Sequence, residues 1–249
     1  MVGTPSALLA VLLFGALVVD NGVLGALLGS ASAALALGSL SLLVVQARLA
    51  LAQENRDLWA LSGVMTDGRP WPTPGGWALE ADAILLLYRE ATLRGLRNVV
   101  ELGPGTSTVL LGRMPQTLSI VGVEHDQSYV RSLRWQIDQH GLKDVQVLHA
   151  PLTRQAYRGR TVDWYSPEAL AELPAQFDVL VVDGPPNWTG HRNRAPAWPS
   201  LRGRMSSGGL VLVDDTARDD EREMVEEWLE EGGVSVILDR RYFMLLEVE

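Results

Sequence analysis

Cysteine is absent from this chain of 249 residues, which excludes disulfide bonds and thiolate metal sites. Lysine is nearly absent as well: Lys143 is the only one, and arginine carries almost all of the positive charge. The formal net charge is −9, and no basic stripe runs along the sequence. Because general nucleic-acid binders use such a stripe to contact phosphates, we expect no nucleic-acid partner.

Basic residues are also missing from the N-terminal part of the chain. Residues 6–45 contain one acidic side chain, Asp20, and no basic one. Residues 23–45 are uncharged and long enough to cross roughly 30 Å of hydrocarbon as a helix. Residues 6–19 form a second apolar run, and the polar residues around Asp20 indicate a tight turn between the two. We therefore expect a transmembrane helical hairpin over residues 1–48, with the lipid bilayer as a partner.

Two other interpretations of this region stay open. A cleaved signal peptide fits poorly, because no positive segment precedes the first apolar run and the second run would remain after cleavage. A buried hairpin of a soluble protein is the other alternative. Arg48 and Arg56 follow the second run, so the positive-inside tendency predicts two spans with the remainder of the chain in the cytoplasm.

Residues 49–76 connect the hairpin to the rest of the chain. Gln46 to Leu61 sets leucines among charged residues and predicts an amphipathic helix. Thr66 to Gly76 is too rich in proline and glycine for regular structure, and we interpret it as a linker that could fold over an active site.

Strand and helix patterns alternate over residues 77–249, which is typical of a parallel sheet with crossover helices. Asp239 to Arg241 is too short for a crossover and predicts a hairpin, so the final strand should be antiparallel. The expected fold is α/β, a Rossmann-like, doubly wound, seven-stranded sheet with an antiparallel last strand. We expect strands at 98–102, 119–124, 145–149, 177–182, 209–213, 234–238 and 242–248, and helices at 77–94, from 106 onward, at 127–140 and at 219–231.

A glycine-rich turn follows the first expected strand, in the sequence ELGPGTST. Gly103 and Gly105 let the backbone bend sharply and approach a ligand. A dehydrogenase fingerprint would have a third glycine where Thr108 stands. An acidic residue, Glu101, stands two positions before the first glycine instead. This combination resembles motif I of class I S-adenosylmethionine (SAM)-dependent methyltransferases, in which the acid serves the methionine moiety. The resemblance implies cofactor contacts from Glu101, Gly103, Gly105, Thr106 and Ser107.

A second acidic residue supports a nucleotide cofactor. Glu124 ends the second expected strand, 19 residues after Gly105, where a carboxylate accepts hydrogen bonds from ribose hydroxyls. A solvated carboxylate at a strand end is the alternative interpretation. His125 and Asp126 follow, and His125 is a candidate contact for the adenine.

Aspartates follow the fourth and fifth expected strands: Asp183 the fourth, and Asp214 with Asp215 the fifth. Carboxyl ends of neighbouring parallel strands meet at the edge of the sheet where ligands bind. Three carboxylates there would repel one another unless a proton, an arginine or a divalent cation lay among them. Mg²⁺ with oxygen ligands is the economical solution.

The resemblance extends from about Trp77 to the C-terminus, and the domain looks like the catechol O-methyltransferase-like branch and bacterial methyltransferase family 24. In that branch an Asp and an Asp-Asn or Asp-Asp pair at these positions hold Mg²⁺ near the acceptor hydroxyls. The resemblance therefore implies metal ligands at Asp183, Asp214 and Asp215. The lysine that commonly serves as base is missing, because Pro185 and Pro186 stand there. The same turn resembles some polysaccharide O-methyltransferases, which favours a sugar or glycan acceptor.

The connection from Asn187 to Arg204 contains several basic residues and no acid, and should overhang the acceptor site. Its arginines could bind an acidic group of the acceptor, neutralise the aspartates or lie solvated. His191 is a candidate general base. Elsewhere, Trp164 and Tyr165 are interpreted as packing residues or an aromatic wall, and residues 221–231 as a solvated charged helix face.

The sequence therefore predicts a membrane-anchored, SAM-dependent methyltransferase that methylates a hydroxyl of a small molecule, glycan or lipid-linked acceptor. Asp183 and His191 are the catalytic candidates, and Mg²⁺ assistance is an option. An N-methyltransferase without metal and a non-catalytic, nucleotide-binding membrane scaffold are the alternatives. A nucleotide-binding oxidoreductase would need the missing third glycine. The oligomeric state stays open.

Overall fold

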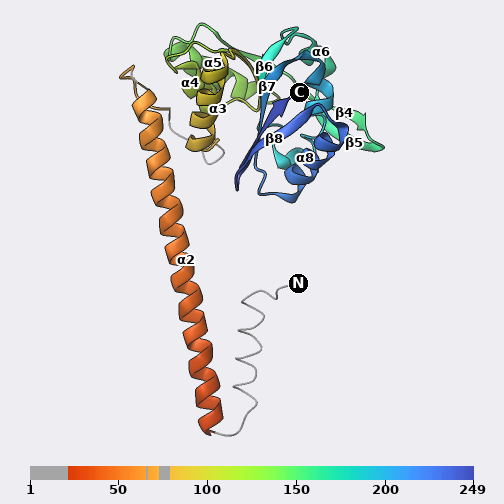
Figure 1. The fold of residues 1–249 in the computed structure, drawn as a ribbon. Helices are drawn as coiled ribbons and strands as arrows, with labels where there is room; N and C mark the ends of the chain where they lie inside the picture. Colours follow the sequence, from red (N-terminus) through yellow and green to blue (C-terminus); the bar gives the residue numbers. More distant parts are fainter. Residues whose placement is uncertain (1–21, 66, 73–78) are drawn as a thin grey trace. The chain divides into compact units, whose positions relative to one another are not determined.

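The structure is a computed structural model that describes residues 22–65, 67–72 and 79–249, with side chains from residue 30 onward (Figure 1). Contacts divide the chain into two units, Met1–Arg56 and Asp57–Glu249. Each unit is considered by itself.

A single helix, α2, runs from Gly22 to Val64 and joins the second predicted span to the predicted amphipathic helix. By length and composition, its Ser30–Val64 part is apolar enough to cross a membrane, and its most apolar window is not buried. Soluble core helices and signal sequences can meet the same criterion of length and composition. The first apolar run, at residues 6–19, and the turn at Asp20 lie outside the described residues, so the hairpin stays a prediction.

The second unit is built on a seven-stranded sheet of order β3-β2-β1-β6-β7-β9-β8. The first five strands in this order are parallel, and β9 is antiparallel to both β7 and β8. The predicted sheet, including its antiparallel last strand, is confirmed. The strands are β1 Asn98–Leu102, β2 Ser119–Glu124, β3 Val145–His149, β6 Phe177–Val182, β7 Met205–Asp214, β8 Val234–Asp239 and β9 Phe243–Val248.

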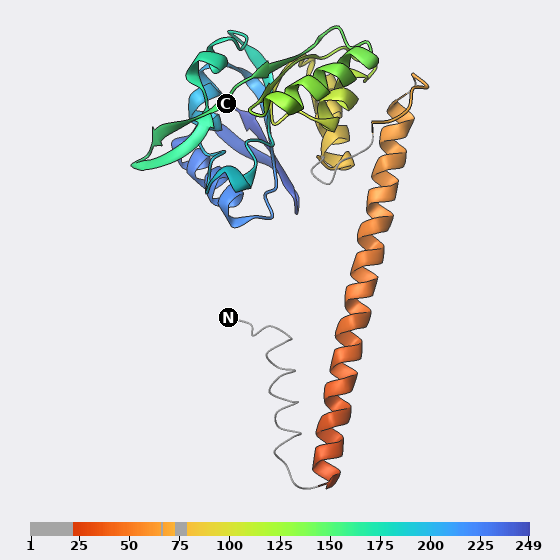
Figure 2. The same ribbon diagram turned by 180° about the vertical axis from the view of Figure 1, so that it is seen from behind.

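Helices cover both faces of the sheet, so both faces are buried. Successive residues of a strand point to opposite faces and therefore belong to different cores. Val99 and Val179 belong to the core on one face, and Val100 and Leu180 to the core on the other. Figures 1 and 2 show α3, α4 and α5 over one half of the domain and α6 and α8 over the other. The helices are α3 Ala81–Arg94, α4 Thr106–Gly112, α5 Gln127–Gln139, α6 Pro167–Ala171, α7 Ala197–Leu201 and α8 Asp219–Glu231, with 3₁₀ turns η1 Asn187–Thr189 and η2 Arg202–Arg204.

An additional hairpin, absent from the predicted elements, follows β3. Its strands are β4 Leu152–Tyr157 and β5 Arg160–Tyr165, paired antiparallel in a sheet of their own. The two turn residues, Arg158 and Gly159, both have positive φ, as tight hairpin turns require. Arginine in the first turn position hides this signal in the sequence. Trp164 and Tyr165, at the end of β5, are both buried, which agrees with the packing interpretation and leaves the aromatic-wall alternative untested.

Residues 67–72, the described part of the predicted linker, are fixed to the end of α4. Arg113 Nε donates to Asp67 Oδ2 at 2.8 Å, and its Nη1 donates to Pro70 O at 2.8 Å. The crossover helix α4 runs back along the parallel strands, so its C-terminal end lies at the edge opposite their carboxyl ends. This part of the linker therefore does not fold over the predicted active site.

Candidate active site

The turn after β1 packs against the turn after β6. Gly103 has a φ of +80°, and a Cβ there would lie 2.8 Å from the backbone nitrogen of Gly184. Asp183 N donates to Leu102 O at 3.0 Å, which extends the pairing of the two strands up to the turns. Protein backbone thus takes the space that a side chain at position 103 would need. This packing brings Asp183 next to the glycine-rich turn.

Glu101 lies fully buried beneath the glycine-rich turn. Its Oε1 accepts a hydrogen bond from Ser107 Oγ, and its Oε2 accepts one from Thr108 Oγ1, both at 2.5 Å. Thr108 Oγ1 itself accepts from Gly105 N at 2.8 Å, which explains a threonine where a dehydrogenase has glycine. Burial raises the pKa of Glu101 to about 7, against the effect of the two hydroxyls. These side chains hold the turn, and their contact with a cofactor stays a prediction.

Glu124 ends β2 at the carboxyl edge of the sheet and is nearly buried. Its Oε1 accepts a hydrogen bond from Asp126 N at 2.6 Å and lies 2.7 Å from His125 Nδ1. The hydrogen bond with Glu124 raises the pKa of His125, against the effect of burial. Asp126 caps α5 by accepting from Ser128 N at 2.6 Å. The roles of Glu124 toward a ribose and of His125 toward an adenine stay predictions.

Two tyrosines lie at this part of the site. Tyr129, near the start of α5, has its Oη 3.0 Å from the position that a Cβ on Gly105 would take. Burial raises the pKa of Tyr129, and the charge of Glu124 adds to the effect. Tyr165 is fully buried, and its hydroxyl has no hydrogen-bond partner among the described residues. The only sequence signal for Tyr129 is its distance of five residues from Glu124, which alone indicates nothing.

Three carboxylates meet at the carboxyl ends of β6 and β7. One oxygen atom from each of Asp183, Asp214 and Asp215 lies within 4.8 Å of the others, so their predicted proximity is confirmed. Burial, followed by the charge of Asp214, raises the pKa of Asp183 well above its usual range. Burial, followed by the charge of Asp215, raises the pKa of Asp214 to about 6. Near neutral pH the Asp183–Asp214 pair therefore retains a proton.

An arginine from the connection after β6 reaches these carboxylates. Arg194 is 5% exposed, and its Nε donates to Pro185 O at 3.1 Å. Its Nη2 lies 3.5 Å from Asp183 Oδ1, and its Nη1 lies 3.1 Å from Asp215 Oδ2 and 3.8 Å from Glu221 Oε1. Arg194 therefore neutralises the aspartates, which is one of the three roles predicted for the arginines of this connection.

These contacts decide how well the site fits a divalent cation. Three carboxylate oxygens within 4.8 Å of one another are a suitable beginning for Mg²⁺, which binds about six oxygen ligands. However, Arg194 contacts two of the three aspartates, and Arg218 Nη1 lies 2.6 Å from Asp215 Oδ2. Two guanidinium groups repel a divalent cation and compete for its ligands. The donor set does not fit Mg²⁺ while the buried Arg194 is in place, whereas the side chain of Arg218 is 33% exposed.

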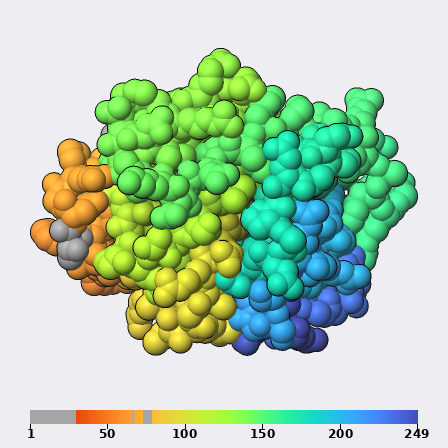
Figure 3. All heavy atoms as spheres, turned by 90° about the horizontal axis from the view of Figure 1, so that it is seen from above, coloured from red at the N-terminus to blue at the C-terminus, as the bar shows by residue number. Residues whose placement is uncertain are grey.

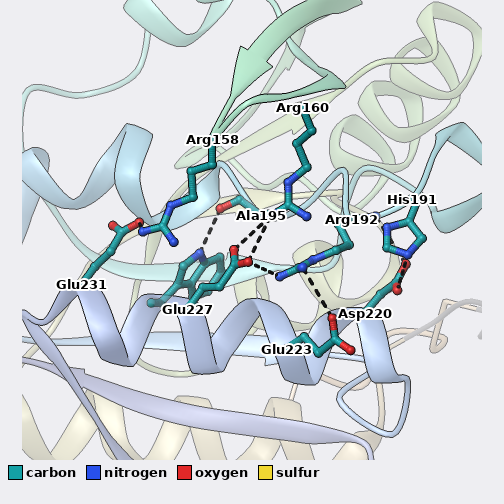
Figure 4. Close-up of polar contacts among 10 residues, drawn as sticks. Arg158, Arg160, His191, Arg192, Ala195, Asp220, Glu223, Glu227 and Glu231 are labelled. Carbon is teal, nitrogen blue, oxygen red and sulfur yellow. Dashed lines mark hydrogen bonds and ion pairs between the residues drawn. The ribbon is translucent and has the colours of Figure 1, made fainter.

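The same connection is tied to α8 by ion pairs (Figure 4). Arg192 Nη2 lies 2.6 Å from Glu227 Oε1, which also accepts a hydrogen bond from Arg160 at 3.0 Å. Together with the buried Glu221, these pairs show that residues 221–231 are only in part a solvated face, since Glu223, Glu226 and Glu230 are exposed. His191 is 73% exposed and pairs with Asp220 at 3.1 Å, so it faces α8 and solvent. Its role as a general base stays a prediction without a supporting contact.

Comparison with known proteins agrees with this arrangement. Residues 100–216 match the family model described as a methyltransferase domain. The matched segment begins in β1, ends just after β7 and contains every candidate site residue named above, from Glu101 to Asp215. No curated protein sequence matches the chain.

Solved structures share the fold of the second unit. An O-methyltransferase from Bacillus cereus in complex with SAH is 16% identical, with 80% of this chain and 91% of that chain covered and a TM-score of 0.53. The SAH-bound Podospora anserina methyltransferase PaMTH1 is 14% identical, with 82% and 95% covered and a TM-score of 0.57. A putative O-methyltransferase from Klebsiella pneumoniae is 18% identical, with 80% and 96% covered and a TM-score of 0.52. The domain has a methyltransferase fold. At these identities the likeness establishes the fold alone.

Proposed function

We propose that this chain is a SAM-dependent methyltransferase that methylates a hydroxyl group. One observation carries the proposal: a glycine-rich turn, Glu124 and three aspartates meet at the carboxyl edge of a methyltransferase-type sheet. The match of residues 100–216 to a methyltransferase domain supports the same activity. In Figure 3 the β1–β3 half, yellow to green, and the β6–β9 half, cyan to blue, meet along the middle of the domain.

The residues of the first half fit SAM, whose sulfonium and ammonium groups are positively charged. Glu124 provides carboxylate oxygens at the position where ribose hydroxyls are bound in related folds. Glu101 places a further acidic group beneath the glycine-rich turn. When bound, the cofactor supplies a methyl group that is already activated. The protein then has mainly to position the acceptor and remove its proton.

We assign the acceptor hydroxyl to Asp183 and Asp214. Asp183 adjoins the glycine-rich turn through the contact of Gly184 with Gly103, so a hydroxyl bound to its carboxylate lies beside the cofactor turn. The pKa of Asp214, about 6, lies close to neutral pH and suits a group that takes up a proton. With the cofactor bound, the acceptor oxygen would give up its proton to the carboxylate pair as it takes the methyl group, and the electron pair of the broken methyl–sulfur bond would stay on sulfur.

The acidic pair also favours oxygen over nitrogen as the methylated atom. A hydroxyl has to lose a proton to become a strong nucleophile, whereas a neutral amine attacks without help. An N-methyltransferase therefore has less use for the Asp183–Asp214 pair. A non-catalytic scaffold would need neither this pair nor Glu124.

We further propose that α2 anchors the enzyme to a membrane, with the methyltransferase domain in the cytoplasm. The helix exposes large aliphatic side chains over residues 35–45, and Arg48 and Arg56 follow these residues. The run at residues 6–19 would add a second span. A membrane location favours a lipid-linked or glycan acceptor, because such acceptors are assembled there.

Transfer of a labelled methyl group tests the proposed activity. The purified full chain is incubated with methyl-labelled SAM and with membranes of source cells that lack the protein. We expect label in lipid or glycan fractions, as methyl ether, reduced at least about 100-fold by Asp183→Asn. Asp138→Asn, an exposed carboxylate on α5, is the matched control and should keep full activity.

The outcomes separate the alternatives. Label found as methylamine would identify an N-methyltransferase and refute the O-methylation proposal. A folded protein that binds SAM but transfers no label to any fraction would support the scaffold.

A further inference from the structure

Arg194 occupies the position at which a cation is needed. Asp183, Asp214, Asp215 and Glu221 bring four carboxyl groups to one end of β6, β7 and α8. Arg194 contacts three of these four residues with its two terminal nitrogens, at 3.1 to 3.8 Å. A buried cluster of this composition requires positive charge close by. Its counter-charge comes from the chain itself.

Residues on both sides of Arg194 are fixed to α8, as Figure 4 shows for Arg192 and Ala195. Arg192 pairs with Glu227 at 2.6 Å and with Glu223 at 3.4 Å. Ala195 O accepts a hydrogen bond from Trp228 Nε1 at 2.9 Å. These anchors leave the residue between them little freedom to withdraw. The guanidinium is therefore a preorganised part of the site.

Arg194 is connected to the turn of Asp183 by a specific hydrogen bond, and not by proximity alone. The Nε hydrogen bond to Pro185 O joins Arg194 to the turn that carries Asp183. Pro185 is one of the two prolines that stand where the resembled family has a basic side chain. A positive charge thus reaches the same turn from a residue further along the connection.

We propose that Arg194 is the built-in cation of the acceptor site, taking the place of a divalent metal ion. Its guanidinium holds the aspartates together and excludes Mg²⁺ from them. Arg194 is a positioning residue, since it acts through the aspartates. The part of this inference that concerns the acceptor rests on the proposed methyltransferase function, whereas exclusion of the metal does not.

Binding of Mn²⁺, followed by electron paramagnetic resonance on the full chain in detergent, tests the inference without an acceptor. We expect no saturable binding by the wild-type protein up to about 1 mM Mn²⁺. Arg194→Met removes the charge at similar size, and should bind one Mn²⁺ at least about tenfold more tightly, because an opposing charge roughly 4 Å away has gone. Arg194→Met combined with Asp214→Asn should lose this binding. Arg194→Lys keeps the charge and should behave as the wild type.

Two results would overturn the inference. The first is stoichiometric Mn²⁺ binding by the wild-type protein below about 0.1 mM that Asp214→Asn removes. The second is an Arg194→Met protein, folded by near-ultraviolet circular dichroism, that binds no Mn²⁺. If that variant does not fold, the wild-type titration decides by itself. Failure of the wild type to bind SAM would refute the proposed function and leave the Mn²⁺ result intact.

Discussion

The two halves of the sheet edge stabilise their buried carboxyl groups in different ways. In the β1–β2 half, Glu101 accepts from two hydroxyls, and Glu124 accepts from a backbone N–H beside an imidazole. In the β6–β7 half, Asp183 and Asp215 lie against the guanidinium of Arg194. The first half thus lacks a permanent cation and suits a positively charged ligand. The second half contains its own cation and suits a neutral hydroxyl.

Removing the cation of the second half should have the largest effect on stability. We expect Arg194→Met to lower the free energy of unfolding by about 3–5 kcal/mol, because it leaves buried carboxylates uncompensated. For a domain of this size the thermal midpoint should fall by roughly 6–20 °C. Arg218→Met is the control: this arginine also contacts Asp215 but is 33% exposed, and its loss should cost about 1 kcal/mol or less. Thermal unfolding followed by near-ultraviolet circular dichroism compares the two variants. Equal thermal midpoints would show that Arg194 stabilises the domain no more than Arg218 does.

The second largest effect is expected for a methyl group added where the turns of the two halves touch. Gly103→Ala places a Cβ against the backbone of Gly184 and requires a positive φ, so we expect a loss of about 2–5 kcal/mol. Gly95→Ala also requires a positive φ but meets nothing within 4 Å, and should cost only about 1 kcal/mol. The difference between the two thermal midpoints isolates the close contact. Equal losses would mean that the turns do not pack as described.

In the first half, where no cation lies beside Glu101, the free energy of unfolding should depend on pH. The folded pKa of Glu101 is about 7, above its ordinary value of 4.5, so the folded protein keeps a proton that the unfolded chain has lost. Stability from this group is complete below about pH 4.5 and is lost as the pH rises to about 7. Between pH 5 and 7.5 we expect the free energy of unfolding to fall by about 2 kcal/mol relative to Glu101→Gln. Parallel pH profiles of the two proteins would contradict the buried position of Glu101.

The smallest effect is expected at His191. Its side chain is largely exposed and pairs with Asp220 rather than with the aspartates of β6 and β7. We expect His191→Gln to change methyl transfer less than about threefold, whereas Asp183→Asn should reduce it at least about 100-fold. Comparable losses in the two variants, measured as label transferred, would restore His191 as the general base.

The sequence predicted the sheet well because buried parallel strands give runs of valine and leucine, such as residues 179–182. It also predicted that Asp183 would meet Asp214 and Asp215, since neighbouring strands end at the same edge. It could not select Arg194 among the five basic residues of its connection, because tertiary contacts with α8 fix that residue. The β4–β5 hairpin was missed because Arg158 adopts a positive φ that its residue type seldom shows.

We propose that the β1–β2 half binds SAM without help from a metal ion. Calorimetric titration of SAM into the detergent-purified full chain, in EDTA and then in MgCl₂, measures this binding. We predict saturable binding with the same Kd in both buffers, weakened about 10- to 100-fold by Glu124→Ala and unchanged by Asp138→Asn. Absence of binding by a folded protein, or binding that Glu124→Ala leaves unchanged, would contradict the account.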